Sequence, residues 1–369
     1  MIVGVPRERK TLEKRIAITP AGAKELVKNG HQVLIETKAG IGSSFPDSAF
    51  EEAGCKIVQT LAEVWNNCEM LVKVKEPHEE EYQYFREDLI LFDYLHLASM
   101  PDVTEAMLNG KITGIAYELV QLEDRRLPLL EPMSEVAGKL STLNGAYHLL
   151  SQNGGRGMLL GGVSGVEPAN VAIIGAGISG FAACKIAVGM GANVKVLDIS
   201  DKALSKLKSV FGSSAEGIMS NSSELEAVCK WADLLIGAVL VPGAAAPKIV
   251  TEEMVKSMKP GSVIVDISID QGGCVETIKP TPLDNPTYVK HGVIHYGVCN
   301  MPAQSPMTST QALTAATLPY VLELADKGLD ALKNNPLRDA LNTYKGKLTN
   351  KAVSEAVGVK YTPIAEALV

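Results

Sequence analysis

One segment near the middle of the chain constrains the fold more than any other. The apolar run of residues 171–174 leads directly into the turn Gly-Ala-Gly-Ile-Ser-Gly, residues 175–180, and then into a helix-like stretch. A helix that starts in this way binds pyrophosphate with its free N–H groups and the positive end of its dipole. Gly175 makes the turn, Gly177 lets the backbone approach the ligand, and Gly180 packs helix against strand. The segment predicts a Rossmann-like dinucleotide site that includes Ala176.

A second apolar run, residues 194–197, bears on the choice of cofactor. It ends in Asp198, at about the 20-residue distance expected of the acid that binds a ribose 2′-OH. A carboxylate there repels a 2′-phosphate, so the pattern favours NAD, although Lys202 nearby leaves NADP open. Because glycine-rich turns are common, an ordinary strand-turn-helix is the alternative interpretation.

Composition narrows the class of protein. The chain has 369 residues, 21% of them charged, and a formal net charge of -7. This length predicts two domains. No long basic cluster points to nucleic acid, and no apolar stretch of about 18 residues or charged leader points to a membrane or to secretion. The six cysteines are scattered without a C-x-x-C pair, so we expect reduced thiols in a cytoplasmic protein and no metal site.

Short β-rich runs alternate with helical patterns through the chain, which predicts a doubly wound α/β fold. The expected strands are residues 2–6, 32–36, 70–75, 89–96 and 112–120 in the first half and 170–174, 194–198, 233–239, 263–268 and 292–299 in the second. One helix is well marked, with Thr19 as N-cap, Pro20 at its first position and Gly30 just past its end. Ser134 is expected to cap an interdomain helix that runs to about residue 150.

We expect two Rossmann-like domains joined by interdomain helices. The NAD-binding domain would span residues 129–306. The tail cannot build a domain alone, so residues 307–369 would complete a discontinuous substrate domain with residues 1–128. The helices near 134–150 and 308–325 are the expected hinges for domain closure.

Four polar residues follow expected strands, where ligands bind in open α/β sheets. They are Arg15, Lys75, His96 and Asp270. Two cations with a histidine suit a small carboxylate or keto acid that needs a proton relay beside a nicotinamide.

Each of the four residues also has a structural interpretation. Arg15 could be a solvated surface residue, and Asp270 could be a turn residue before Gly-Gly. Strict alternation puts Lys73 and Lys75 on one face of a strand, so either could be a solvated edge lysine. His96 could be a hydrogen-bonded structural histidine.

Over nearly its whole length the chain resembles the alanine dehydrogenase family. The matching segments occur in the same order and comprise residues 15–20, 73–77, 94–98, 132–138, 161–168, 236–243 and 266–274. The resemblance implies that Arg15 and Lys75 hold the substrate carboxylate and carbonyl, while His96 and Asp270 handle protons. It also implies a closed homohexamer. Beyond the glycine turn, it implies NAD contacts at Ser134, Asp198, Ser220, Val239, Leu240, Ile267, Val298, Asn300 and Met301.

The chain departs from the family pattern at its second hinge, residues 300–310. Ala303 stands where the family commonly has glycine, and Met307 where it often has a basic residue. These changes bear on hinge motion and closure and not on the chemistry.

The resemblance implies NAD-dependent oxidative deamination of L-alanine to pyruvate and ammonium, and the reverse reaction. Three alternatives stay open: a dehydrogenase of another amino acid, the NAD-binding component of a proton-pumping transhydrogenase, and a catalytically silent NAD sensor. Lys75 and His96 argue against the transhydrogenase component, because such a module needs no grip on a substrate carboxylate.

Overall fold

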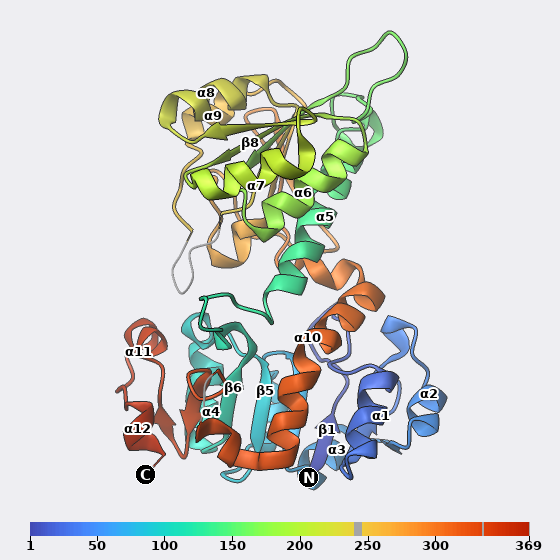
Figure 1. Ribbon diagram of the computed structural model, residues 1–369, viewed down its shortest axis with the longest axis vertical. Helices are drawn as coiled ribbons and strands as arrows, with labels where there is room; N and C mark the ends of the chain where they lie inside the picture. The colour runs from blue at the N-terminus through green and yellow to red at the C-terminus, as the bar shows by residue number, and fades with distance from the viewer. Residues whose placement is uncertain (240–245, 334–335, 369) are drawn as a thin grey trace. The chain divides into compact units, whose positions relative to one another are not determined.

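The computed structural model describes residues 1–239, 246–333 and 336–368. The chain forms two compact units, one made of Met1–Met133 with Ala303–Val369 and the other of Ser134–Pro302. Each unit contains a predominantly parallel sheet with helices (Figure 1), so the predicted α/β class is confirmed. The division predicted from sequence placed the boundaries after residue 128 and before residue 307.

The first unit is built on an eight-stranded sheet in the order β15-β14-β6-β5-β4-β1-β2-β3. Its strands are β1 Ile2–Val5, β2 Gln32–Glu36, β3 Lys56–Val58, β4 Met70–Lys75, β5 Ile90–Tyr94, β6 Thr113–Ala116, β14 Leu341–Tyr344 and β15 Lys347–Leu348. Its helices are α1 Pro20–Lys28, α2 Asp47–Glu52, α3 Leu61–Asn67, α4 Pro101–Asn109, α10 Pro306–Lys327, α11 Lys351–Val357 and α12 Ile364–Ala367.

The strand order of the first unit creates a switch point between β1 and β4. From β1 the chain builds β2 and β3 on one side and then returns to place β4, β5 and β6 on the other, all parallel. Ligands bind outside the carboxyl ends of strands at such a point. The segment from the tail adds β14, which pairs antiparallel with β6.

Helix α1 begins where its sequence signals predict. The Thr19 hydroxyl accepts a hydrogen bond from the N–H of Gly22 at 3.1 Å, and Pro20 is the first helical residue. Gly30 follows the end of the helix with a φ of 85°. A residue with a Cβ rarely adopts this conformation, so glycine terminates the helix without strain.

The second unit contains a seven-stranded sheet in the order β12-β13-β11-β10-β7-β8-β9. Its strands are β7 Asn170–Ile174, β8 Asn193–Asp198, β9 Ala215–Met219, β10 Leu234–Gly237, β11 Val263–Asp266, β12 Thr287–Lys290 and β13 Val293–Tyr296. Its helices are α6 Ile178–Gly189, α7 Asp201–Phe211, α8 Ser222–Trp231 and α9 Glu252–Lys256, and α5 Glu131–His148 begins just before the unit boundary.

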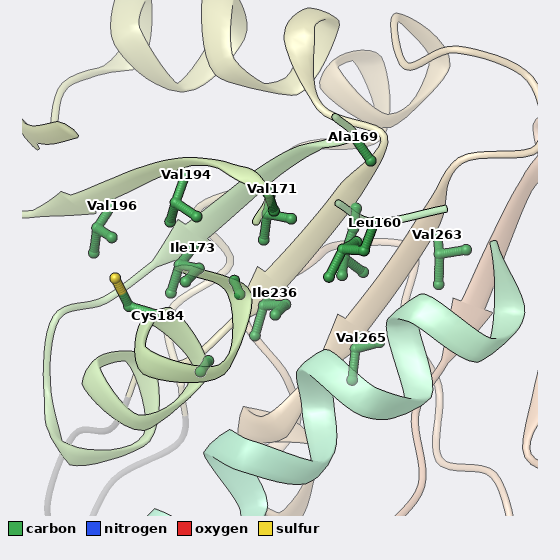
Figure 2. Packing of buried hydrophobic residues seen from close by; sticks show 14 of the residues in the cluster. Leu160, Ala169, Val171, Ile173, Cys184, Val194, Val196, Ile236, Val263 and Val265 are labelled. Atoms are coloured by element: carbon green, nitrogen blue, oxygen red, sulfur yellow. The ribbon is translucent and has the colours of Figure 1, made fainter. Parts of the chain in front are cut away.

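The core of the second unit is a close-packed layer of aliphatic side chains. Val171 and Ile173 of β7 lie among Val194 of β8, Ile236 of β10 and Cys184 of α6 (Figure 2). All of these side chains are at most 5% exposed. This packing fixes the strand from which the glycine turn departs.

One predicted helix start was wrong. Ser134 does not cap a helix but lies inside α5, which begins at Glu131. Pro132 is tolerated there because the first turn of a helix leaves its N–H groups unpaired in any case. The second predicted interdomain helix begins earlier than expected, at Pro306, and ends at Lys327.

Candidate functional site

In the first unit, three of the predicted site residues follow adjacent parallel strands. Arg15 lies in the loop after β1, Lys75 is the last residue of β4, and His96 lies two residues beyond β5. The order β5-β4-β1 makes these strands neighbours, so their carboxyl ends share one edge of the sheet. The structure therefore brings Arg15, Lys75 and His96 to the same edge.

Arg15 is buried, which excludes the solvated surface residue considered from sequence. Its residue exposure is 2%, and Glu13 binds it with two parallel hydrogen bonds, Nε to Oε1 at 2.7 Å and Nη2 to Oε2 at 2.5 Å. Burial lowers the pKa of the guanidinium, but Glu13 more than offsets this and the pKa lies above its ordinary value. Nη1 is directed at the sulfur of Met133, a weak acceptor, at 3.2 Å. The bidentate pair thus fixes the plane of the Arg15 fork.

Lys75 and Lys73 occupy different environments at a bulge in β4. Val72 pairs with Phe92 and Lys75 with Tyr94, so two residues of β4 lie opposite one of β5. A bulge bends its strand and re-aims the side chains beyond it. The Lys75 side chain is 12% exposed, and its Nζ lies 3.9 Å from Glu76.

The alternative considered from sequence, a solvated edge lysine, does not hold for Lys73. Its side chain is fully buried, and its Nζ donates to both oxygens of Glu81 at 2.9 and 3.1 Å. The carboxylates of Glu8 and Asp93 also face it, and despite burial these acids raise its pKa. Lys73 is therefore a structural cation in the interior of the first unit.

His96 adopts a left-handed backbone conformation, with a φ of 48°, immediately before the 3-10 helix Leu97–Ser99. Its N–H donates to Oε1 of Glu118 at 2.7 Å, and its Nδ1 lies 3.9 Å from the same oxygen. The imidazole lies parallel to the ring of Tyr94, with centroids 5.8 Å apart. The side chain is thus held at a strand end and remains 37% exposed.

A cleft of about 310 Å³ opens beside Arg15. Five cationic side chains and two acidic ones line it: Arg7, Arg9, Lys14, Arg15, Lys38, Glu8 and Glu13. Its charge suits an anionic small molecule.

In the second unit, the glycine turn has the geometry of a phosphate cradle. Gly175 has a φ of 105°, and a Cβ on Gly180 would lie 1.8 Å from the carbonyl oxygen of Gly175. A Cβ on Gly177 would meet no protein atom within 4 Å. Gly177 is also the N-cap of α6 and supplies no side-chain hydrogen bond to it. Free N–H groups beside open space fit a pyrophosphate at the start of this helix.

Asp198 lies at the end of β8 beside this turn. Its Oδ2 accepts from the N–H of Ala176 at 2.6 Å, and its Oδ1 accepts from the N–H of Ser200 at 2.7 Å. The N–H of Ser220 donates to the Asp198 carbonyl at 2.9 Å. The structure thus brings Asp198, Ala176 and Ser220 together at one edge of the second sheet.

Asp270 is exposed and lies in the 3-10 helix Ile267–Gln271 after β11. Its Oδ1 accepts from the N–H of Asn300 at 3.1 Å, which joins two of the predicted residues. Sequence reasoning missed Asp266, which organises this segment. Fully buried, it accepts from the N–H groups of Ser268, Cys274 and Val275 at 2.8 to 3.0 Å.

The remaining predicted cofactor residues that the structure describes belong to the second unit. The N–H of Val239 donates to the Ser268 hydroxyl at 3.0 Å, while Ile267 and Ser134 are partly buried. Val298 and Met301 are at most 2% exposed and belong to the core. Leu240 lies outside the described residues.

At the second hinge, Ala303 is buried in the 3-10 helix Met301–Gln304, whereas Met307 is exposed in the first turn of α10. All six cysteines are free thiols. In the described ranges, no group of His, Cys, Asp and Glu side chains is arranged to hold a metal ion. No helix among the same residues is long and apolar enough to span a bilayer.

Comparison with known proteins identifies the family. Residues 4–137 match the N-terminal domain, and residues 141–351 the C-terminal domain, of the family described as alanine dehydrogenase/PNT. The alanine dehydrogenase of Methanococcus maripaludis and alanine dehydrogenase 2 of Staphylococcus aureus are each 54% identical to the chain, with complete coverage of both proteins.

Solved structures agree with this assignment. A solved structure named L-alanine dehydrogenase is 49% identical to the chain. The match covers 97% of the chain and 99% of the solved chain, and the TM-score is 0.94. The structure of a transhydrogenase from Sinorhizobium meliloti is 24% identical to the chain. The match covers 95% of the chain and 100% of the solved chain, and its TM-score of 0.81 shows the shared fold. The resemblance found in the sequence is thus confirmed: the chain belongs to the alanine dehydrogenase/PNT family.

Proposed function

We propose that the protein catalyses the NAD-dependent oxidative deamination of L-alanine to pyruvate and ammonium, and the reverse reductive amination. The observation that carries the proposal is the placement of Lys75 and His96 at the ends of β4 and β5, with Arg15 in the loop after the neighbouring β1. It is supported by the identity to alanine dehydrogenases along the full chain.

The first unit would bind the substrate through its two cations. Arg15, held in plane by Glu13, would bind the carboxylate, and Lys75 would bind and polarise the carbonyl oxygen of pyruvate. Charge-assisted hydrogen bonds to both ends of a small keto acid leave it one orientation.

NAD is the proposed cofactor, because the cradle at Gly177 and the carboxylate of Asp198 fit a dinucleotide without a 2′-phosphate. When bound, it would accept the hydride that leaves the α-carbon of alanine. The proposal includes the NAD contacts that the family resemblance implies. These are the glycine turn and the other predicted cofactor residues between Ser134 and Met301.

Proton transfer would fall to His96 or Asp270. Water that attacks the iminium carbon loses a proton, and a neutral imidazole or a carboxylate at the site would accept it. Glu118 and Tyr94 hold the backbone and the ring of His96. The choice between the two bases is open to a pH-rate comparison of His96→Gln with wild type.

The proposal extends to assembly and location. The exposed apolar side chains of Leu159, Val163 and Val166 support self-association, for which the family resemblance suggests a homohexamer. Six free thiols support a reducing, cytoplasmic compartment. Light scattering on the purified protein measures the oligomer directly.

The decisive experiment is the formation of NADH from NAD with a panel of amino acids. We expect L-alanine to give the highest kcat/KM. A higher value with another amino acid would assign a related dehydrogenase. NADH binding without turnover of any amino acid would favour a transhydrogenase module or an NAD sensor.

A further inference from the structure

The backbone of β4 next to Lys75 is held by a side chain from another part of the sheet. Glu8 follows β1, and its Oε1 accepts a hydrogen bond from the N–H of Val74 at 2.6 Å. Val74 lies within the bulge, between the register pairs of Val72 and Lys75 with β5. At a bulge some backbone groups make no hydrogen bond to the neighbouring strand. Here the carboxylate of Glu8 accepts the hydrogen bond from the N–H of Val74.

Glu8 also belongs to a cluster with more acid than base. Its side chain is 2% exposed, and its Oε2 lies 3.5 Å from Nζ of Lys73. The same ammonium faces Glu81 and Asp93, so one cation lies among three carboxyl groups. Glu8 also interacts electrostatically with Glu13, Arg15 and Tyr117, and it lines the cationic cleft beside Arg15.

Burial of this cluster costs stability. It raises the pKa of Glu8 to about 7 and that of Asp93 well above its ordinary value. An apolar side chain in place of Glu8 would avoid this cost but would leave the buried N–H of Val74 without its acceptor. Only a hydrogen-bond acceptor at position 8 can therefore supply the contact with the N–H of Val74.

We propose that Glu8 is a positioning residue for Lys75. Its carboxylate fixes the N–H of Val74 in the bulge and so directs the Lys75 side chain toward the substrate. The inference rests on the proposed substrate role of Lys75. A shift of about 1 Å in a substrate-holding group is enough to cost about a hundredfold in rate.

Glu81 offers a matched control. It is also fully buried and binds the same Lys73, but its described contacts are with Lys73, Trp65 and the N–H of His78. Glu81→Gln therefore removes a charge from the same cluster and leaves the contact between Glu8 and Val74 in place.

The test compares Glu8→Leu, Glu8→Gln and Glu81→Gln in steady-state reductive amination of pyruvate. We expect Glu8→Leu to raise the KM for pyruvate at least about tenfold with the Kd for NADH unchanged. Glu8→Gln retains an oxygen that accepts from Val74, so its KM should stay within about threefold of wild type. Glu81→Gln should lower the melting temperature and leave the KM within the same limit.

Lys75→Ala separates failure of this inference from failure of the proposed function. If Lys75→Ala leaves turnover intact, the substrate role of Lys75 is wrong. If Lys75→Ala is inactive but Glu8→Leu has a normal KM, or Glu81→Gln shows the same rise in KM, the positioning role of Glu8 is overturned. Should Glu8→Leu not fold, Glu8→Asp replaces it, because its carboxylate is one methylene too short to reach Val74.

Discussion

The candidate sites of the two units consist of different chemical groups. In the second unit the site is built around backbone N–H groups, at the uncapped helix start at Gly177 and where the carboxylates of Asp198 and Asp266 accept hydrogen bonds. In the first unit it consists of charged side chains held by other buried charges, as Glu13 holds Arg15. A site made of backbone groups can be predicted from a short stretch of sequence. A site of paired charges cannot, because it depends on partners that folding brings together.

The strongest test of this division is Lys75→Ala. If the site of the first unit binds the substrate and not the cofactor, Lys75→Ala should lower kcat/KM for pyruvate by about a thousandfold, as expected for the loss of a group that stabilises developing charge. NADH affinity, measured by fluorescence titration, should not change. Loss of NADH binding would show that the two sites are not separable in this way.

Lys73→Met should affect stability instead. Removing the ammonium leaves Glu8 and Glu81 buried without their cation, which costs about 3–5 kcal/mol. Thermal denaturation should reveal this loss, while Lys75→Ala, at a partly exposed position, should lose far less. Equal losses of stability in the two variants would contradict the distinction that the bulge creates between them.

The buried acid of the first unit should also appear in the pH dependence of stability. The pKa of Glu8 is about 7 in the folded protein against an ordinary value of 4.5, so the folded state holds the proton more tightly. Stability from this group is present below pH 4.5 and is lost as the pH rises to about 7, by about 3 kcal/mol. Melting temperatures of wild type and Glu8→Gln from about pH 5 to about pH 8 test this. Relative to the variant, wild type should lose stability as the pH rises, and parallel curves would contradict the prediction.

In the second unit, Asp198→Ala should weaken NAD binding by about 1.5–3 kcal/mol through loss of a charge-assisted hydrogen bond. It should also relax discrimination against NADP, because the repulsion toward a 2′-phosphate disappears. Dissociation constants for the two cofactors give the measurement. An unchanged ratio would assign Asp198 only to its contacts with Ala176 and Ser200.

The smallest effect is expected for Gly177→Ala. Its Cβ would meet no protein atom within 4 Å, so the unit should fold normally, but the methyl group would occupy the cradle. NADH affinity should fall about tenfold, equivalent to about 1.4 kcal/mol. Gly189→Ala, at the far end of the same helix and equally free of contacts, is the control and should bind NADH normally. Equal affinities would remove Gly177 from the cofactor site.

Local signals in the sequence predicted much of the fold. The strand Asn170–Ile174, its glycine turn and the cap at Thr19 all lie where the pattern placed them. Short strands such as Lys56–Val58 and Lys347–Leu348 were missed because two or three residues carry no readable alternation. Ser134 was misplaced as a cap because capping residues are also tolerated within helices.

The sequence alone determined the α/β class, the glycine turn and the strand ends at which Arg15, Lys75, His96 and Asp270 lie, because these depend on neighbours along the chain. Only the tertiary structure decided which lysine is buried. Alternation treats Lys73 and Lys75 alike, but the bulge between Val72 and Lys75 breaks the alternation, and Glu8 and Glu81 surround only Lys73. Burial and charge pairing join residues distant in sequence, so they are set by packing and not by local pattern.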